Sequence, residues 1–193
     1  MFFAAPPATA AWKHHHVRSG FEVAYFHVLD DGFRIEGCTT AIENGQTWTV
    51  DYEIQLAATW TARSGRIVGR SVSGSYSTTL ETDGAGQWQI NGAPAPYLDG
   101  CFDVDLESSA LTNALPVRRM GLRVGEHSAA PAAYVRALDL AVERLEQTYV
   151  RGNDQDSHQR YNYIAPAFGF TCQLIYDHSG LVLDYPGIAV RAG

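Results

Sequence analysis

The chain has 193 residues, of which 46% are hydrophobic and 18% are charged, and its formal net charge at pH 7 is −7. This length indicates one domain, large enough to keep a core without disulfides or a structural metal. The acidic balance argues against nucleic acid or an anionic membrane surface as the main partner. No apolar run approaches the roughly 20 residues that a membrane span needs.

The first eleven residues are rich in alanine and proline, and they have neither the basic start nor the apolar run of a secretion signal. We therefore expect a flexible segment over residues 1–19 and a single β-rich domain over residues 20–193. His14, His15 and His16 cannot all face one metal ion on a regular strand, so we interpret them as flexible surface residues.

Most of the chain after Phe21 alternates between apolar and polar residues, which is typical of strands with one buried face. Residues 47–56 are the clearest case, because every second residue from Trp48 is apolar. Asp30-Asp31-Gly32 predicts a tight hairpin, since Asp-Gly tolerates positive φ. The pattern predicts about ten strands, over residues 21–29, 33–41, 47–56, 65–74, 76–82, 87–90, 138–150, 158–164, 168–176 and 180–184.

Helical sequence is scarce. The best candidate is Ser128–Arg136, with Pro131 in its first turn, and a second short helix or turn is expected around Ser108–Asn113. Thr112–Pro116 is interpreted as a turn in which Pro116 fixes the exit. Many antiparallel strands with few helices predict a sandwich, a barrel or a strongly curved sheet. Long strands with one apolar face favour the curved or barrel form, because something must cover that face.

The cysteines Cys38, Cys101 and Cys172 are odd in number and widely spaced, which suits neither a disulfide framework nor a zinc site. We expect three reduced thiols and a cytoplasmic location. Cys101 lies between Asp99 and Asp103, and negative neighbours raise the pKa of a thiol, so a cysteine nucleophile is not expected.

Three segments put charged residues into apolar, strand-like sequence, where an unpaired charge costs several kcal/mol if it is buried. They are Leu98–Asp105, Thr112–Arg119 and Leu181–Gly187. Their residue order is Leu-Asp-Gly-Cys-x-Asp-Val-Asp, Thr-Asn-x-Leu-Pro-x-Arg-Arg and Leu-Val-x-Asp-Tyr-Pro-Gly. In this order the three segments resemble a bacterial family labelled putative glycolipid-binding.

The resemblance covers about Gly20 to Arg191 and includes further matching segments at residues 20–22, 48–54, 83–88 and 159–163. It implies an antiparallel sheet curved around short helices, similar to lipoprotein carriers of the bacterial envelope. The expected fold is therefore mainly β (α+β), a strongly curved antiparallel sheet or half-barrel with a few short helices covering the concave face. The resemblance also implies a glycolipid or another amphiphile as the ligand, since a half-barrel leaves an apolar concavity.

The candidate binding residues are acidic, basic and aromatic. If residues 101–106 form a strand, Asp103 and Asp105 share one face, and a pair of arginines follows for bidentate pairing. These residues would either bind sugar hydroxyls or form a charged network on the solvent-exposed face of the sheet. The tyrosines would form an aromatic wall or simple cross-strand packing. The full set is Asp99, Asp103, Asp105, Arg118, Arg119, Tyr161, Tyr163, Asp184, Tyr185, Trp48 and Tyr52.

The leading hypothesis is a binding protein or carrier in glycolipid metabolism or transport, without catalytic activity. Its apolar concave face would hold the acyl part, and the aspartate–arginine cluster would meet the polar head. The apolar residues would be drawn from Trp48, Val50, Tyr52, Phe168, Phe170 and Leu174. One alternative is a hydrolase-type enzyme on a sugar or lipid derivative, with Asp99 or Asp103 of the Asp99/Asp103/Asp105 cluster as acid or base.

Another alternative is a scaffold that only oligomerises through its sheet, for example as a homodimer. The sequence has no Gly-x-Ser-x-Gly motif, no Gly-x-Gly-x-x-Gly motif and no P-loop. We therefore expect no nucleotide cofactor, and no residue spacing calls for a metal ion.

Overall fold

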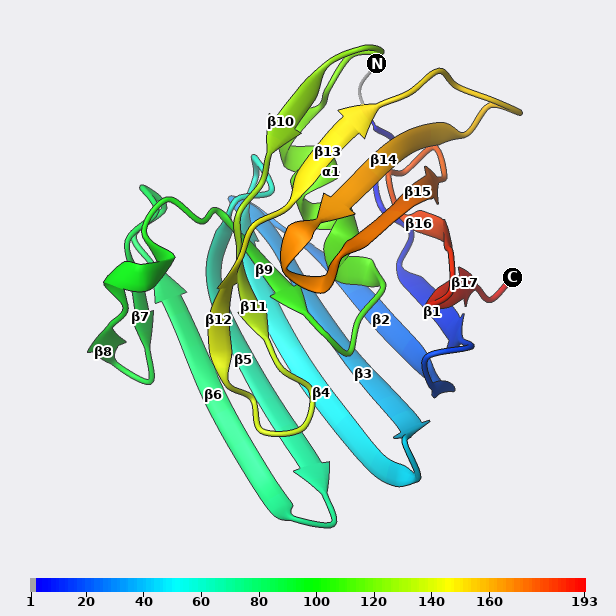
Figure 1. Ribbon diagram of the computed structural model, residues 1–193. Coiled ribbons are helices and arrows are strands. Elements are labelled where there is room, and N and C mark those ends of the chain that lie inside the picture. The colour runs from blue at the N-terminus through cyan, green and yellow to red at the C-terminus, as the bar shows by residue number, and fades with distance from the viewer. Residues whose placement is uncertain (1–2) are drawn as a thin grey trace.

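The computed structural model describes residues 3–193, which form two sheets of 14 and three strands (Figure 1). The large sheet contains β1 (Thr9–His14), β2 (Ser19–Leu29), β3 (Gly32–Glu43), β4 (Gln46–Ala57), β5 (Ala62–Ser71), β6 (Gly74–Thr82), β7 (Trp88–Ile90), β8 (Ala93–Pro94), β10 (His127–Ala129), β13 (Thr148–Arg151), β14 (Gln159–Ala165), β15 (Phe170–Tyr176), β16 (Val182–Tyr185) and β17 (Ala189–Arg191). The small sheet contains β9 (Asp103–Leu106), β11 (Ala132–Val135) and β12 (Val142–Leu145). The described chain also has one α-helix, α1 (Ala114–Met120), and the 3₁₀ turns η1 (Pro96–Leu98), η2 (Leu111–Asn113) and η3 (Pro166–Phe168).

The large sheet is antiparallel throughout and runs in the order β10-β13-β14-β15-β16-β17-β1-β2-β3-β4-β5-β6-β7-β8. Sequence neighbours pair almost everywhere, and the junction of β1 with β17 brings the two ends of the chain together. Strands β10 and β8 end the sheet without pairing to each other. The expected curved antiparallel sheet is confirmed. Its long strands follow the predicted alternation, as in β4, where every second residue from Trp48 is buried.

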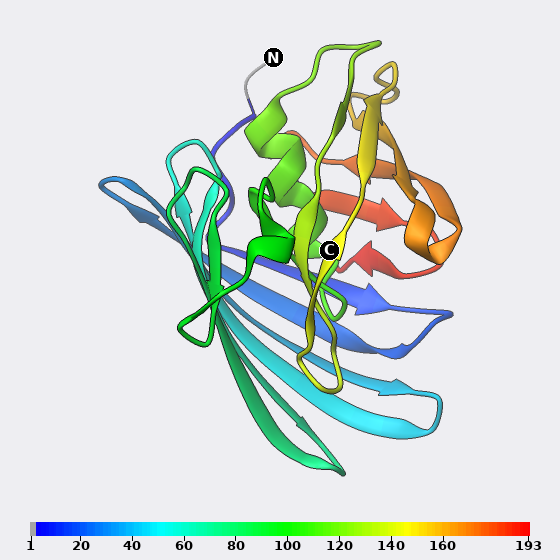
Figure 2. The same ribbon diagram turned by 60° about the vertical axis from the view of Figure 1, so that its left-hand side comes forward.

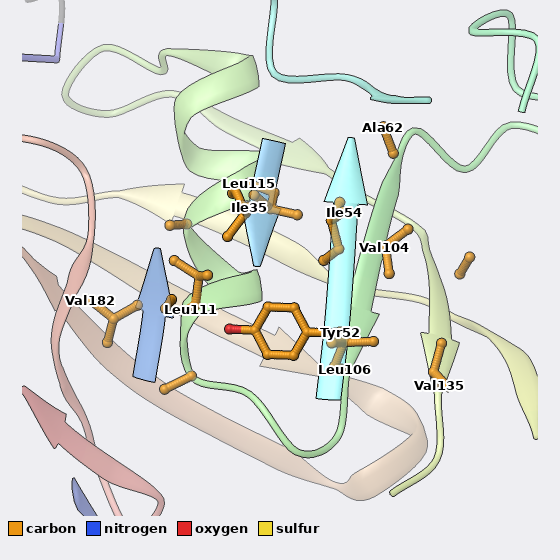
Figure 3. Packing of buried hydrophobic residues seen from close by; sticks show 14 of the residues in the cluster. Ile35, Tyr52, Ile54, Ala62, Val104, Leu106, Leu111, Leu115, Val135 and Val182 are labelled. Carbon is orange, nitrogen blue, oxygen red and sulfur yellow. The ribbon is translucent and has the colours of Figure 1, made fainter. Parts of the chain in front are cut away.

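The concave face of the sheet is covered by the chain's own middle segment. Figure 2 shows α1 enclosed between the β1–β6 half and the β13–β16 half. In Figure 3, Leu111 and Leu115 of this segment lie next to Ile35 and Tyr52 of the sheet. All of these side chains belong to one buried apolar cluster. A short helix on the concave face was expected, and the consequence is that the concavity is largely filled with protein.

The predicted helix at Ser128–Arg136 is wrong, because this segment contains β10 and β11. Strand β11 is buried over its whole length and pairs with β9 on one side and β12 on the other. An apolar run of this kind reads equally well as a buried strand or a buried helix.

The helix α1 lies instead at Ala114–Met120, where a turn was predicted. Pro116 is its third residue, and a proline is tolerated there because the first-turn N–H groups have no partner within the helix. Gly121 ends the helix with φ 56°, the left-handed conformation typical of a glycine after a helix. The short turn expected around Ser108–Asn113 is present as η2.

Two other segments also differ from expectation. Residues 1–19 were expected to be flexible, yet they contain β1, which pairs with β2 and β17. Ala10, Trp12 and His14 of β1 are buried, so His14 is not a surface residue. The single strand expected over residues 138–150 is two strands in different sheets, β12 and β13. Gln147 lies between them, buried, and donates a hydrogen bond to Asp105.

Candidate functional site

The predicted aspartate–arginine constellation is divided in the structure. Arg119 pairs with Asp103 through two hydrogen bonds, Nε to Oδ1 at 3.0 Å and Nη2 to Oδ2 at 2.6 Å. Arg118 points elsewhere, donates to the backbone oxygen of Ser179 and stacks on the Trp60 ring at 3.8 Å. Because adjacent residues on a helix point about 100° apart, both arginines cannot reach the same carboxylate.

Asp99 does not join this pair. Its side chain is exposed, and its backbone oxygen accepts a hydrogen bond of 2.6 Å from Arg144 Nη1. Cys101, two residues further, is a buried free thiol, and burial more than its acidic neighbours raises its pKa to about 11. The thiol is therefore protonated near neutral pH, as the sequence predicted.

A cavity of about 260 Å³ lies beside the aspartate strand β9. It is bounded by the β1–β2 loop, the ends of β3 and β9, η2, β11, β12 and the β14–β17 part of the sheet. Its lining residues are Val17, Arg18, Glu43, Asp105, Leu106, Glu107, Ser109, Asn113, Tyr134, Leu145, Tyr163, Phe168, Phe170, Tyr185 and Ile188. The cavity thus joins segments that are far apart in the sequence.

One wall of the cavity is aromatic. The rings of Tyr163 and Phe170 lie 6.3 Å apart, and each lies about 6 Å from Tyr185, at 6.1 and 6.0 Å between centroids. Tyr134 and Phe168 form a second pair at 5.5 Å. These spacings are those of interacting aromatic rings, so the wall is packed and presents ring faces and edges to the cavity.

The inner end of the cavity is polar and centred on Asp105. Its Oδ1 accepts a hydrogen bond of 2.8 Å from Thr112 Oγ1, and its Oδ2 accepts one of 3.0 Å from Gln147 Nε2. Asn113 also lines the cavity, and its Oδ1 accepts a hydrogen bond of 2.9 Å from Tyr149 Oη. Burial raises the pKa of Asp105 to about 6, against the lowering effect of the two hydrogen bonds.

We predict that Asp105→Asn changes the pH dependence of stability. In the unfolded chain an aspartate has a pKa near 3.9, so the protonated carboxyl of Asp105 stabilises the fold below that pH. This contribution is lost as the pH rises through about 6. Between pH 4 and pH 7.5, the free energy of unfolding of the variant should therefore gain about 2–3 kcal/mol relative to the wild type.

Urea unfolding at several pH values measures this difference, and a difference that does not vary with pH would contradict the assignment. Several other ionisable groups face Asp105 and are unchanged in the variant. They are Asp103 on the same strand, Glu107, Arg18, Tyr134, Tyr149, Tyr163, Tyr176 and Tyr185.

Another wall of the cavity is held by Arg18, which is buried. Its Nη1 donates a hydrogen bond of 2.8 Å to the backbone oxygen of Glu107, and its Nε lies 3.6 Å from Glu43 Oε2. The guanidinium also stacks on Trp48 at 5.3 Å, so Trp48 supports Arg18 from outside the cavity. Arg18 therefore ties the β1–β2 loop to the end of β3 and to the residue after β9.

Three of the predicted binding residues, Asp105, Tyr163 and Tyr185, line the cavity. Tyr52 and Tyr161 are buried in the core, the first donating a hydrogen bond of 2.8 Å to Glu22. The others lie outside the cavity: Asp99, Asp103, Arg118, Arg119, Asp184 and Trp48. Of the apolar residues expected to hold an acyl part, Phe168 and Phe170 line the cavity, whereas Trp48, Val50, Tyr52 and Leu174 are core residues.

Sequence reasoning missed Arg18, Glu107 and Tyr134. Arg18 follows His14, His15 and His16, and this segment was considered only as a possible metal site. Glu107 and Tyr134 belong to segments that the sequence did not place next to each other, since Tyr134 was assigned to a helix. Arg18, a single charge just before the strand predicted from Phe21, was the one local signal available.

Neither a metal centre nor a membrane helix is evident in residues 3–193. No group of three or more histidine, cysteine, aspartate or glutamate side chains in this range is arranged to hold a metal ion. No helix in the described part of the chain is long and apolar enough to cross a bilayer.

The family profile described as "Putative glycolipid-binding" matches residues 9–191, nearly the whole sequence. The chain belongs to this family. Among proteins with curated functions, none matches the chain. The family assignment agrees with the resemblance seen in the three charged segments, and it supports a binding protein at the level of the family.

Two solved structures are similar to this member of the family. A crystal structure of a DUF1089 family protein from Pseudomonas aeruginosa has 30% sequence identity and a TM-score of 0.74, over 89% of this chain and 92% of that chain. A β-barrel-like protein of the domain of unknown function DUF1849 from Brucella abortus has 10% identity and a TM-score of 0.52, over 95% and 92% of the two chains. The second likeness shows the fold alone.

Proposed function

We propose that the protein binds an amphiphile of the glycolipid class in the aromatic cavity, as one step of glycolipid metabolism or transport. The observation that carries the proposal is the composition of the cavity wall. The aromatic rings of Tyr163, Phe170 and Tyr185 line the same cavity as the buried polar side chains of Asp105 and Arg18. A pocket of apolar walls with a few convergent polar groups is the usual form of a small-molecule site.

The family description supports the same class of ligand. The free thiols of Cys38, Cys101 and Cys172 support a cytoplasmic place of action.

The geometry does not favour the hydrolase alternative with Asp99 or Asp103 as the acid or base. Asp103 is held by two hydrogen bonds to Arg119, and Asp99 is exposed on another part of the surface. Neither residue lines the cavity. A general acid or base must lie within hydrogen-bond reach of its substrate, so this pair is poorly placed for catalysis in the cavity.

We expect freshly purified protein to carry an amphiphile, or to take one up from a bacterial lipid extract, with a defined mass increase in native mass spectrometry. Phe168→Glu should lower the bound fraction at least about tenfold, because it places a charge at the mouth of the cavity. Phe21→Glu is the matched control, since Phe21 is 42% exposed, close to the 49% of Phe168, and lies outside the cavity.

Equal binding by the two variants, or an unliganded mass that the lipid extract does not change, would contradict the proposal. Circular dichroism of both variants checks that they are folded.

A further inference from the structure

We propose that the cavity takes the sugar headgroup of the amphiphile and leaves its hydrocarbon tail outside. This inference rests on the proposed function and specifies which end of the ligand enters. It reverses the arrangement expected for a half-barrel carrier, in which the tail would lie in the concavity.

The first argument is space. The concave face of the sheet is filled by β9, η2 and α1, whose side chains Val104, Leu111 and Leu115 are fully buried against it (Figure 3). The cavity beside β9 has a volume of about 260 Å³, just below the roughly 300–1,000 Å³ typical of sites for drug-sized ligands. A single sugar ring suits such a volume, whereas the paired acyl chains of a membrane lipid do not.

The second argument is the burial of polar groups inside the cavity. Asp105, Ser109 and Asn113 are 7%, 5% and 3% exposed, and they are buried together with the apolar lining residues Leu106, Leu145 and Tyr163. The most exposed lining residues are apolar, with Val17 at 51% and Phe168 at 49%. A tail that entered first would bring hydrocarbon against a buried carboxyl, a hydroxyl and an amide, which is unfavourable because the remaining hydrogen-bonding capacity of these groups would go unused.

The third argument is the match between a sugar ring and the two kinds of wall. Sugar hydroxyls are hydrogen-bond donors, and Asp105 and Glu107 supply carboxyl acceptors in the cavity. The C–H faces of the ring are apolar and pack on aromatic faces, which Tyr163, Phe170 and Tyr185 provide. The tail would then leave past Val17 and Phe168 at the mouth.

The charge of the lining restricts the headgroup further. The lining contains one arginine, Arg18, and three carboxyl groups, those of Glu43, Asp105 and Glu107. The Nε of Arg18 lies 3.6 Å from the carboxyl group of Glu43. Arg18 donates a hydrogen bond to the Glu107 backbone and forms an ion pair with Glu43, so its charge is shared with a carboxylate before any ligand binds. A phosphate or carboxylate head would meet uncompensated negative charge at Asp105, so the ligand class is a neutral glycoside.

Saturation-transfer-difference NMR with monomeric octyl glycosides tests the orientation directly. We would use the octyl β-D-glucoside, galactoside and mannoside, with octanoate and octyl phosphate as probes that keep the tail and change the head. The expected result is binding of at least one glycoside, with the ring protons saturated more strongly than the terminal methyl group. Octanoate and octyl phosphate should bind at least about tenfold more weakly.

Asp105→Asn should weaken glycoside binding about 10- to 100-fold, as expected for loss of a charged hydrogen-bond acceptor. Asp184→Asn makes the same carboxyl-to-amide change outside the cavity and should leave binding unchanged.

Stronger saturation of the tail, or binding of octanoate or octyl phosphate as tight as that of every glycoside, would overturn the orientation while leaving amphiphile binding intact. Failure of all five probes to bind would overturn both the orientation and the proposed function.

Discussion

Arg119→Met is expected to lower the free energy of unfolding by about 3–5 kcal/mol, because it leaves the carboxylate of Asp103 buried and unpaired. The Asp103 side chain is 1% exposed, and in the wild type both of its oxygens accept hydrogen bonds from Arg119. Burial alone raises the pKa of Asp103, and Arg119 opposes that rise. Without the arginine, the variant should regain stability as the pH falls, since protonation removes the buried charge.

A surface ion pair provides the control for this prediction. Arg63 Nη1 and Asp31 Oδ2 are also 2.6 Å apart, but their side chains are 44% and 70% exposed. Arg63→Met should therefore cost only about 0–1 kcal/mol. The double variant Asp103→Asn with Arg119→Met should recover part of the lost free energy of unfolding, because a neutral amide replaces the buried, unpaired carboxylate. Urea midpoints that fall equally in the two single arginine variants would contradict the structural role of the buried pair.

The pairing of Asp103 with Arg119 explains how a segment of apolar, strand-like sequence can contain a buried charged residue. A charge in an apolar strand must be matched, and the sequence offered Arg118 and Arg119 as candidate partners for the aspartates of this strand. It could not predict which one, because Arg118 and Arg119 are adjacent in the sequence and diverge only once they lie on a helix. The helix itself was not predicted, because a proline at position 116 is typical of a turn as well as of the first turn of a helix.

The same limit applies to the cavity. Alternation along β14 correctly placed Tyr161 and Tyr163 on one face of a strand, as their burial shows. It could not say which part of that face the rest of the chain would cover. Tyr161 packs edge-on against Tyr176 in the closed core, whereas Tyr163 lines the cavity. The difference depends on where the middle segment lies, and long-range packing of that kind leaves no local pattern.

Glu22→Leu is the second substitution expected to have a large effect, with a loss of about 3–5 kcal/mol. Glu22 is completely buried, and its carboxylate accepts hydrogen bonds from Tyr52 Oη at 2.8 Å, the Ala110 N–H at 2.7 Å and the Ser109 hydroxyl. Leucine would leave all three donors without an acceptor, and each buried unsatisfied group costs about 1–3 kcal/mol. Glu36→Leu replaces a 42% exposed glutamate whose ion pairs with His27 and Arg34 lie at the surface, and it should change stability by at most about 1 kcal/mol.

Glu22 also connects the core to the cavity, because two of its three donors belong to the segment that forms the inner end of the cavity. Ser109 lines the cavity, and its Oγ lies 3.3 Å from the backbone N of Thr112, whose hydroxyl holds Asp105. Loss of Glu22 should therefore weaken octyl glycoside binding even at temperatures where the variant is folded, whereas Glu36→Leu should not. Reduced stability with unchanged affinity would show that the inner end of the cavity is held without Glu22, and that β9, Thr112 and Gln147 suffice to position Asp105.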